Sequence, residues 1–133
     1  MIKERYVNLE VAKLLRDKGF DEKCAKIYNI NVGLIFEGYN IRNSELTENS
    51  ELVTAPTQAM ACDWIEEKYN ISIEVYVNII GYTVGFCYAL QNPNTASDII
   101  QNDMTDGDNP DGSWSSKELV YDNAIKYVLT ELV

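Results

Sequence analysis

The chain has 133 residues with 21 acidic and 11 basic side chains, a formal charge of -10, and it contains no histidine. Because histidine is the usual general acid or base near neutral pH and the commonest metal ligand, its absence removes Ser-His and Cys-His nucleophiles and nearly all catalytic zinc sites. The acidic balance argues against a protein that binds nucleic-acid phosphates, since such binding requires clustered lysine and arginine.

The chain is long enough to enclose one hydrophobic core, so we expect a single domain over residues 1–133. No apolar run approaches the ~20 residues that a membrane span requires. The charged N-terminus, residues 1–5, lacks the apolar stretch of a signal peptide, which predicts a cytoplasmic protein. In that compartment Cys24, Cys62 and Cys87 are expected to be free thiols, buried as small apolar residues.

The first part of the chain predicts a helix followed by a hairpin. Asn8 is suited to cap the N-terminus of the helix and Gly19 to end it, with an apolar stripe between them. Extended stretches at 24–29 and 34–39 follow, and the residues at 31–33 are typical of the turn that joins two strands.

The middle of the chain gives the clearest pattern. After a long polar loop near 38–53, Thr57 can cap a second helix that ends near Asn70. Apolar and polar residues then alternate over 71–79 and again over 82–90. Alternation of this length predicts two antiparallel strands with one buried face, while the opposite face of the second strand carries only small residues.

A second long polar loop, near 91–113, contains two prolines, two glycines and many Asp and Asn residues, with a short ordered piece expected at 97–104. The last helix begins near Ser115 or Ser116 and places apolar residues at helical spacing as far as Leu132. The predicted fold class is α+β in the order α-β-β-α-β-β-α, an antiparallel sheet of two hairpins with helices packed on one face.

The acidic segment 106–112 invites interpretation as a calcium site. Aligned with an EF-hand loop, it places Asn109, Asp111 and Glu118 at ligand positions, but Gly107 stands where the first aspartate is required. A solvated acidic loop explains the segment better. The sequence also lacks a nucleophile elbow and a glycine-rich phosphate loop, so we expect no metal, no cofactor and no catalysis.

Nine tyrosines and two tryptophans are the remaining conspicuous feature. Aromatic residues are enriched in protein interfaces, although most of those in this chain are expected to belong to the core, Trp64 among them. Tyr76 falls on the polar face of its predicted strand, and Trp114 lies between a loop and a helix start. These two residues are therefore the candidate interface residues.

Several stretches occur together, in order, along most of the chain. They are the segment 7–28 with Gly19-Phe20-Asp21-Glu22, then Ala55-Pro56-Thr57-Gln58-Ala59, then Trp64-Ile65-Glu66-Glu67-Lys68-Tyr69, and finally Tyr121-Asp122-Asn123-Ala124-Ile125. In these stretches the chain resembles a group of uncharacterised small acidic proteins of Bacteroides-type gut bacteria and their prophages. The resemblance implies a bacterial or phage protein encoded on a mobile element, and it brings no activity, cofactor or functional residue.

We expect a small acidic binding or accessory protein that acts through protein–protein interaction, as a homodimer or with another protein, by the hairpin edge, Tyr76 or Trp114. Neither a nucleic acid nor a membrane is expected as a partner. Two alternatives stay open. Residues 27–133 carry a net charge of -12, which fits an acidic nucleic-acid mimic that inhibits a host DNA-binding protein. A small-molecule-binding protein or enzyme would need a deep pocket that holds two of Asp63, Glu74, Cys62 and Cys87.

Overall fold

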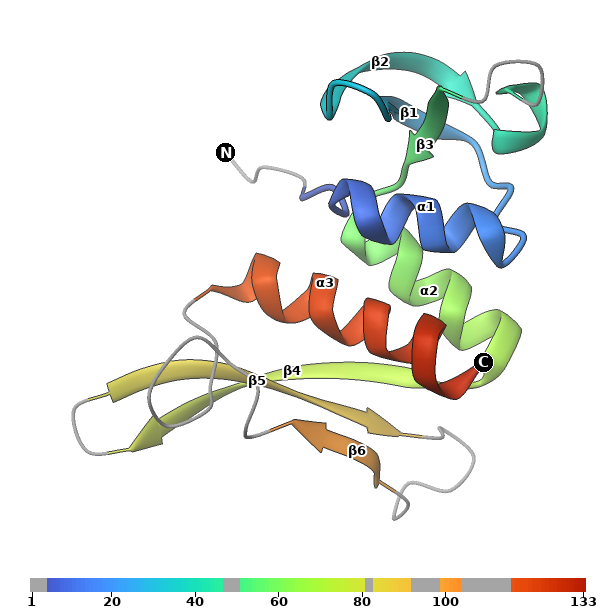
Figure 1. The fold of residues 1–133 in the computed structure, drawn as a ribbon. Helices are drawn as coiled ribbons and strands as arrows, with labels where there is room; N and C mark the ends of the chain where they lie inside the picture. Colours follow the sequence, from blue (N-terminus) through green and yellow to red (C-terminus); the bar gives the residue numbers. More distant parts are fainter. Residues whose placement is uncertain (1–4, 47–50, 81–82, 92–98, 104–115) are drawn as a thin grey trace. The chain divides into compact units, whose positions relative to one another are not determined.

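The computed structural model describes residues 5–46, 51–80, 83–91, 99–103 and 116–133. The chain divides into two compact units, Met1–Ala61 and Cys62–Val133. Within the described residues, each predicted hairpin belongs to its own three-stranded antiparallel sheet, as Figure 1 shows. The predicted α+β class is confirmed, and the grouping of both units into one domain stays a prediction.

The first helix, α1 (Leu9–Asp17), begins and ends as its sequence predicts. The Asn8 side chain accepts a hydrogen bond of 2.9 Å from an amide of the first turn, which satisfies one of the unpaired donors at the helix start. Gly19 follows the helix with a φ of 93°, a conformation that L side chains rarely adopt. The amide of the buried Phe20 then donates to the Leu15 carbonyl at 2.9 Å, and this bond closes the C-terminal cap.

The sheet of the first unit contains β1 (Cys24–Asn29), β2 (Leu34–Ile41) and β3 (Leu52–Ala55) in the order β2-β1-β3. The predicted hairpin of β1 and β2 is confirmed, and Gly33 has the positive φ of 71° that its turn requires. The Asn29 side chain stabilises this turn because it accepts hydrogen bonds from two of the turn amides.

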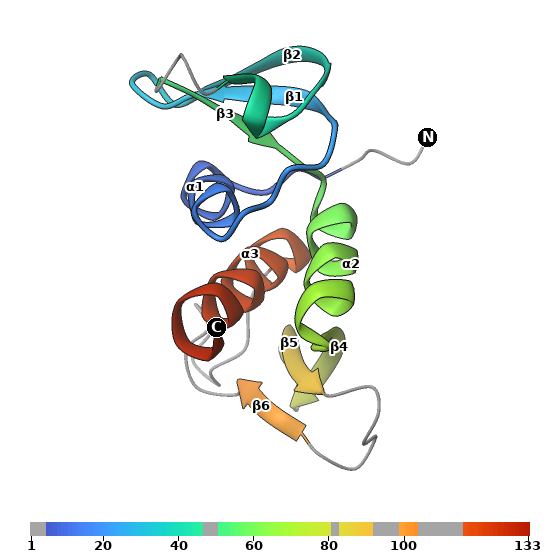
Figure 2. The ribbon, with the colours of Figure 1, turned by 90° about the vertical axis from the view of Figure 1, so that its right-hand side faces the viewer.

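One face of this sheet packs against α1, as Figures 1 and 2 show. The Tyr28 hydroxyl on β1 donates to the Val7 carbonyl just before α1, at 2.7 Å. Val53, which lies opposite Tyr28 on β3, is fully buried. The core of the first unit therefore lies between α1 and the face that carries Tyr28 and Val53.

A bulge in β2 interrupts the pairing with β1. Lys26 lies opposite Glu37, but Cys24 lies opposite Ile41, so β2 holds two more residues than β1 over this stretch. Asn40 within it has a φ of 59°, a value that asparagine tolerates better than most residues. The bulge bends β2 and ends its regular, flat part at Glu37.

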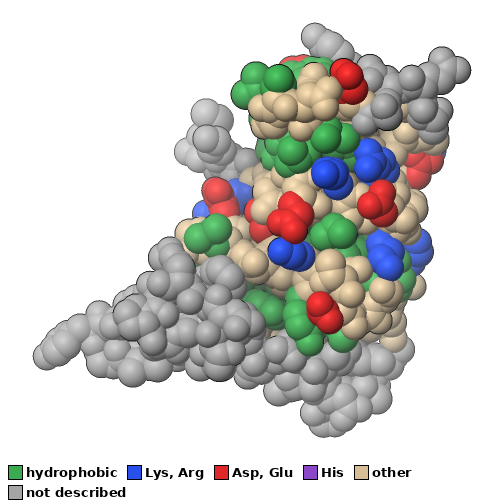
Figure 3. All heavy atoms as spheres, viewed as in Figure 1, with side chains coloured by type: hydrophobic (Ala, Val, Ile, Leu, Met, Phe, Trp, Pro, Cys, Tyr) green, Lys and Arg blue, Asp and Glu red, His purple; other side chains and the backbone are tan. Residues whose placement is uncertain are grey.

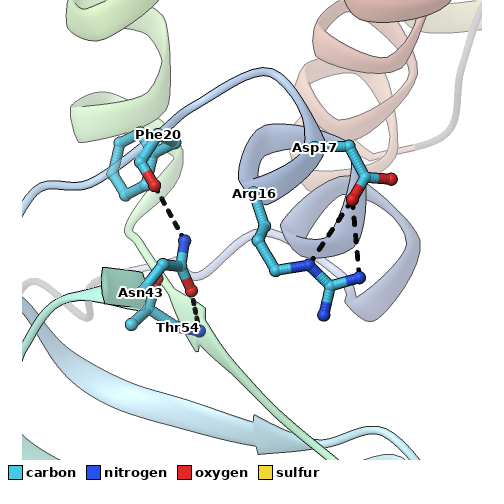
Figure 4. A network of polar contacts seen from close by, with 5 residues as sticks. All are labelled: Arg16, Asp17, Phe20, Asn43 and Thr54. Atoms are coloured by element: carbon cyan, nitrogen blue, oxygen red, sulfur yellow. Dashed lines mark hydrogen bonds and ion pairs between the residues drawn. The ribbon is translucent and has the colours of Figure 1, made fainter. Parts of the chain in front are cut away.

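The prediction of a polar loop near 38–53 is wrong at both of its ends and in its middle. The strand β2 continues through the bulge, the 3₁₀ turn η1 occupies Asn43–Leu46, and β3 begins before the predicted loop ends. As Figure 4 shows, the Asn43 side chain donates to the Phe20 carbonyl at 2.9 Å and accepts from the Thr54 amide at 3.0 Å. The polar residues that suggested a loop thus satisfy backbone groups of the folded unit.

The second helix, α2 (Gln58–Tyr69), is capped at both ends by the predicted residues. The Thr57 hydroxyl accepts a hydrogen bond of 3.1 Å from an amide of the first turn, and Asn70 leaves the helix with a φ of 58°. Trp64 was expected in the core but is only half-buried. It packs edge-to-face on Tyr69, five residues further along the helix, with ring centroids 5.8 Å apart.

The sheet of the second unit has the order β4-β5-β6, with β4 at Ser72–Ile80, β5 at Thr83–Gln91 and β6 at Ile99–Asp103. The pairing of β4 with β5 confirms the predicted hairpin. The strand β6 lies within the short ordered piece predicted at 97–104, and it pairs antiparallel with β5. The central position of β5 follows from these two pairings.

Burial on β5 differs from the predicted pattern of one buried face. Tyr88 and Leu90 on the apolar face are buried, and so are Cys87 and Ala89 on the opposite face. Small side chains permit this close packing on the second face, because neighbouring atoms can approach the backbone of the strand. Alternation alone indicates which residues share a face, not how many faces are covered.

The last helix, α3 (Lys117–Tyr127), covers one face of the second sheet and continues into a π-helical turn, η2 (Val128–Leu132). Figures 1 and 2 both show α3 lying along β4 and β5. Ser116 is the N-cap, as predicted, and its hydroxyl accepts from the Leu119 amide at 3.2 Å. The buried face consists of apolar residues at helical spacing: Val120, Ala124, Ile125, Val128 and Leu129.

The bulge generates the first testable prediction. Gly38 is buried, and a Cβ atom there would lie 2.5 Å from Ile27 Cγ1 and 3.2 Å from Ile41 Cγ2. We expect Gly38→Ala to lower the free energy of unfolding by about 1–3 kcal/mol, since the strand must move to admit the methyl group. Urea unfolding followed by circular dichroism measures this change.

Gly33→Asn is the matched control for Gly38→Ala. A Cβ atom at Gly33 meets nothing within 4 Å, and asparagine tolerates the positive φ of the turn. We therefore expect this variant to unfold within about 1 kcal/mol of the wild type. Equal destabilisation by both substitutions would show that close packing on Ile27 does not set the shape of β2.

Candidate functional site

The described surface of the first unit contains a group of exposed large apolar side chains on and beside β2. Val32 in the turn is 64% exposed, and Leu34, Ile35 and Phe36 on the strand are 66%, 40% and 43% exposed. Figure 3 shows hydrophobic side chains at the surface over the β1–β2 hairpin. Single exposed apolar residues are ordinary, but neighbouring ones on one element are typical of an interaction surface. We call these four residues the β2 apolar edge.

The β2 apolar edge occupies both faces of its strand. Tyr28 lies on the face packed against α1, and Ile35 lies opposite it, so the Ile35 side chain belongs to that face. Phe36 lies opposite Ile27 and shares the other face with Leu34, because side chains alternate along a strand. A protein that adds a strand to this edge can contact both sets of side chains.

Backbone groups are available on the same edge. In the order β2-β1-β3, β2 is an outer strand, and none of the described strands pairs with its outer side. Outer strands present unpaired N–H and C=O groups, which is why natural proteins usually protect them with charge, proline or a bulge. Here the charge of Glu37 and the bulge protect only the C-terminal part of β2, and Leu34–Phe36 carry no such protection.

The site is electrically neutral. No charged residue occurs between Lys26 and Glu37, which includes the whole β1–β2 turn. These two residues lie opposite each other across the strands and form an ion pair. The hydrogen bond from the ammonium group to the Glu37 carboxylate raises the pKa of Lys26. The two charged residues therefore stand at the two ends of the uncharged segment, and their opposite charges cancel.

Of the predicted interface residues, the structure places Tyr76 on β4 of the second unit. Its side chain is half-buried, and it lies opposite the buried Cys87 on β5. Trp114 lies outside the described residues. The aromatic residues of the sequence did not indicate the β2 apolar edge. Its signal in the sequence is the unbroken run Leu34-Ile35-Phe36, which fails to alternate directly after a turn.

The cysteines that an enzyme would use as nucleophiles are either buried or have a raised pKa. Cys24 and Cys87 are buried free thiols, as predicted, whereas Cys62 keeps some exposure. Burial, and then the negative charges of Asp63, Asp122 and Glu66, raises the pKa of Cys62 to about 12. A thiol with such a pKa is a poor nucleophile at neutral pH, since the thiolate is the reactive form.

The surface hollow on α1 is not the deep pocket that an enzyme would need. It is lined by side chains of one helix, namely Leu9, Glu10, Lys13, Leu14 and Asp17, and it holds none of the cysteines or carboxylates expected to do chemistry. Within the described ranges, no three Cys, Asp or Glu side chains gather closely enough to hold a metal ion. The loop considered for calcium lies outside those ranges, apart from Glu118.

Comparison of the chain with protein-family models, curated proteins and solved structures finds no match. Among the helices that the structure describes, none has both the length and the apolar character needed to cross a membrane. The assignment of a site therefore depends on the physical features of the described surface.

The raised pKa of Cys62 generates a second prediction. At pH 8 a pKa of about 12 leaves roughly one two-thousandth of the thiolate that an ordinary thiol with a pKa near 8.5 would have. We expect iodoacetamide to alkylate Cys62 at least a hundredfold more slowly in the native protein than in 8 M urea. Peptide mass spectrometry of samples taken over time measures both rates, and similar rates would contradict the assigned environment.

Proposed function

We propose that the protein is a non-catalytic binding module that acts through protein–protein interaction at the β2 apolar edge. The observation that carries this proposal is the combination of exposed apolar side chains with an outer strand, without charge, in Leu34–Phe36. Addition of a strand to a sheet edge is a recurrent mode of recognition, in which backbone hydrogen bonds supply affinity and alternate side chains supply specificity.

The proposal is supported by the location of the charge as well as by the exposed residues. The first unit contains eight basic and nine acidic side chains, a net charge of -1, whereas the second unit carries -9. Strand addition on the nearly neutral unit avoids the charge repulsion that an acidic partner would meet on the second unit. The acidic second unit then contributes to solubility rather than to contact.

Substitution of Leu34 tests this function. We expect Leu34→Lys to reduce the capture of binding proteins by at least tenfold, since a charge on the edge must be desolvated when a strand is added. The tagged protein is immobilised and exposed to lysate of its host cell mixed with an untagged copy of the chain. Bound proteins are then quantified by mass spectrometry.

Leu119→Lys is the matched control, because Leu119 is 42% exposed and lies on α3 of the second unit. It makes the same chemical change at an exposed leucine that belongs to the other unit. We expect the control to capture the same proteins as the wild type. If Leu34→Lys also captures them undiminished, the β2 apolar edge is not the binding surface.

A second candidate function, acidic mimicry of nucleic acid, is favoured by the concentration of charge in the second unit. Twelve acidic and three basic residues fall within 72 positions of one compact unit. Such a unit can attract a basic protein surface that normally binds phosphates. The support is weaker than for the β2 apolar edge because four of these twelve carboxylates, those of Asp98, Asp106, Asp108 and Asp111, lie outside the described residues.

The response of binding to salt concentration distinguishes the two proposed functions. Mimicry depends on exposed charges, whose interactions are screened over about 10 Å at 0.1 M salt and about 3 Å at 1 M. Under mimicry, we expect binding to heparin-retained proteins of the host lysate to fall more than tenfold between 0.1 and 0.5 M salt. Binding that survives this change would exclude mimicry.

A further inference from the structure

We propose that the occupant of the β2 apolar edge is β2 of a second copy of this chain, paired antiparallel about a two-fold axis with Ile35 opposite Ile35 of the second copy. The inference depends on the proposed function, because it names the partner of the same surface. It assigns a pairing geometry as well as a partner, and each can be tested.

Charge favours a second copy at this place on the molecule. Two chains of net charge -10 repel each other, so self-association is favoured at a segment that itself carries little of that charge. The first unit has a net charge of only -1, and the segment from Ile27 to Phe36 has no charged residue. The two edges can therefore meet without placing carboxylates against carboxylates.

Symmetry restricts the register of the pairing. Two identical strands related by a two-fold axis perpendicular to the sheet run antiparallel, and each residue stays on its own face. Residues directly opposite one another share a face. Ile35 can therefore lie opposite Ile35 or a residue an even number of positions away, but not opposite Phe36.

The start of β2, the bulge and the charges select one of these registers. With Leu34 at the axis, Ile35 and Phe36 lie opposite Gly33 and Val32, which precede the strand. With Ile35 at the axis, Leu34 lies opposite Phe36 of the second copy and Gly33 lies opposite Glu37, so pairing ends before the bulge at Gly38. With Phe36 at the axis, pairing extends into the bulge and Glu37 faces an isoleucine. With Glu37 at the axis, two carboxylates face each other, which is destabilising.

The expected dimer is weak. Five residues from each strand form a small contact compared with the ~1,200–2,000 Å² of a standard interface, so we expect dissociation at roughly micromolar concentrations. Added salt screens the repulsion between the acidic units and leaves the neutral contact intact. The dimer should therefore strengthen between 0.1 and 0.5 M salt, opposite to the effect expected for mimicry.

The experiment compares interchain disulfide formation in three single variants of the full chain: Ile35→Cys, Leu34→Cys and Leu119→Cys. In the proposed register the Cα atoms at position 35 of the two copies are about 4.5–5.5 Å apart, within the range of about 4.4–6.8 Å that a disulfide spans. The two positions 34 are diagonal neighbours about 7–8 Å apart, which is too far. Leu119→Cys gives the rate of random collision for an exposed thiol on the second unit, and the wild type controls for the three native cysteines.

We expect Ile35→Cys to form at least tenfold more covalent dimer than either other variant under mild oxidation, read on non-reducing gels. Light scattering of the wild type at rising concentration should show the same dimer. Equal yields at positions 35 and 34 would overturn the register, and yields no higher than at position 119 would overturn self-pairing. If self-pairing fails while Leu34→Lys still abolishes capture of another protein, the proposed function stands without this partner. Circular dichroism confirms that each variant is folded.

Discussion

The close approach of Gly38 to Ile27 is the constraint on which the β2 apolar edge depends. It allows β2 to bend over the β1 side chain, and the bend ends the flat part of the outer strand after Glu37. Without the bulge, the outer edge would continue to Ile41 and accept strands in several registers. With the bulge, only the short apolar segment beside the turn is open to pairing. Packing inside the unit therefore sets the length of the edge that another strand could use.

The two units differ in the physical character that matters for binding. The first has a nearly neutral composition and an apolar outer strand, while the second holds almost all of the excess negative charge. Charge of one sign keeps a protein soluble but opposes its association with copies of itself. Because the proposed pairing segment and most of the negative charge belong to different units, one chain can have both properties. This separation also gives the two proposed functions opposite responses to salt.

Local signals in the sequence predicted the helices and hairpins because local interactions form them. Asn8, Thr57 and Ser116 cap their helices through bonds within four residues, and the alternation before and after 81 needs only neighbouring strands. The strand β3 and the bulge could not be predicted in this way. The strand β3 has only four residues, and partners distant in sequence such as Asn43 hold it in place. The bulge depends on the contact between Gly38 and Ile27, which lies eleven positions earlier. The β2 apolar edge was missed for a related reason, since a hydrophobic run indicates burial until the strand order shows that it lies outside.

Hydrogen exchange at the backbone amides of residues 33–37 tests the central claim most directly, because strand addition must protect the outer amides of β2 whatever side chains take part. Exchange is measured by mass spectrometry at two protein concentrations, one below and one above the concentration at which light scattering detects a dimer. The account predicts slower exchange in this segment at the higher concentration, with the amides of α3 unchanged. A dimer that forms without protection of these amides would show that the β2 apolar edge is not the pairing surface.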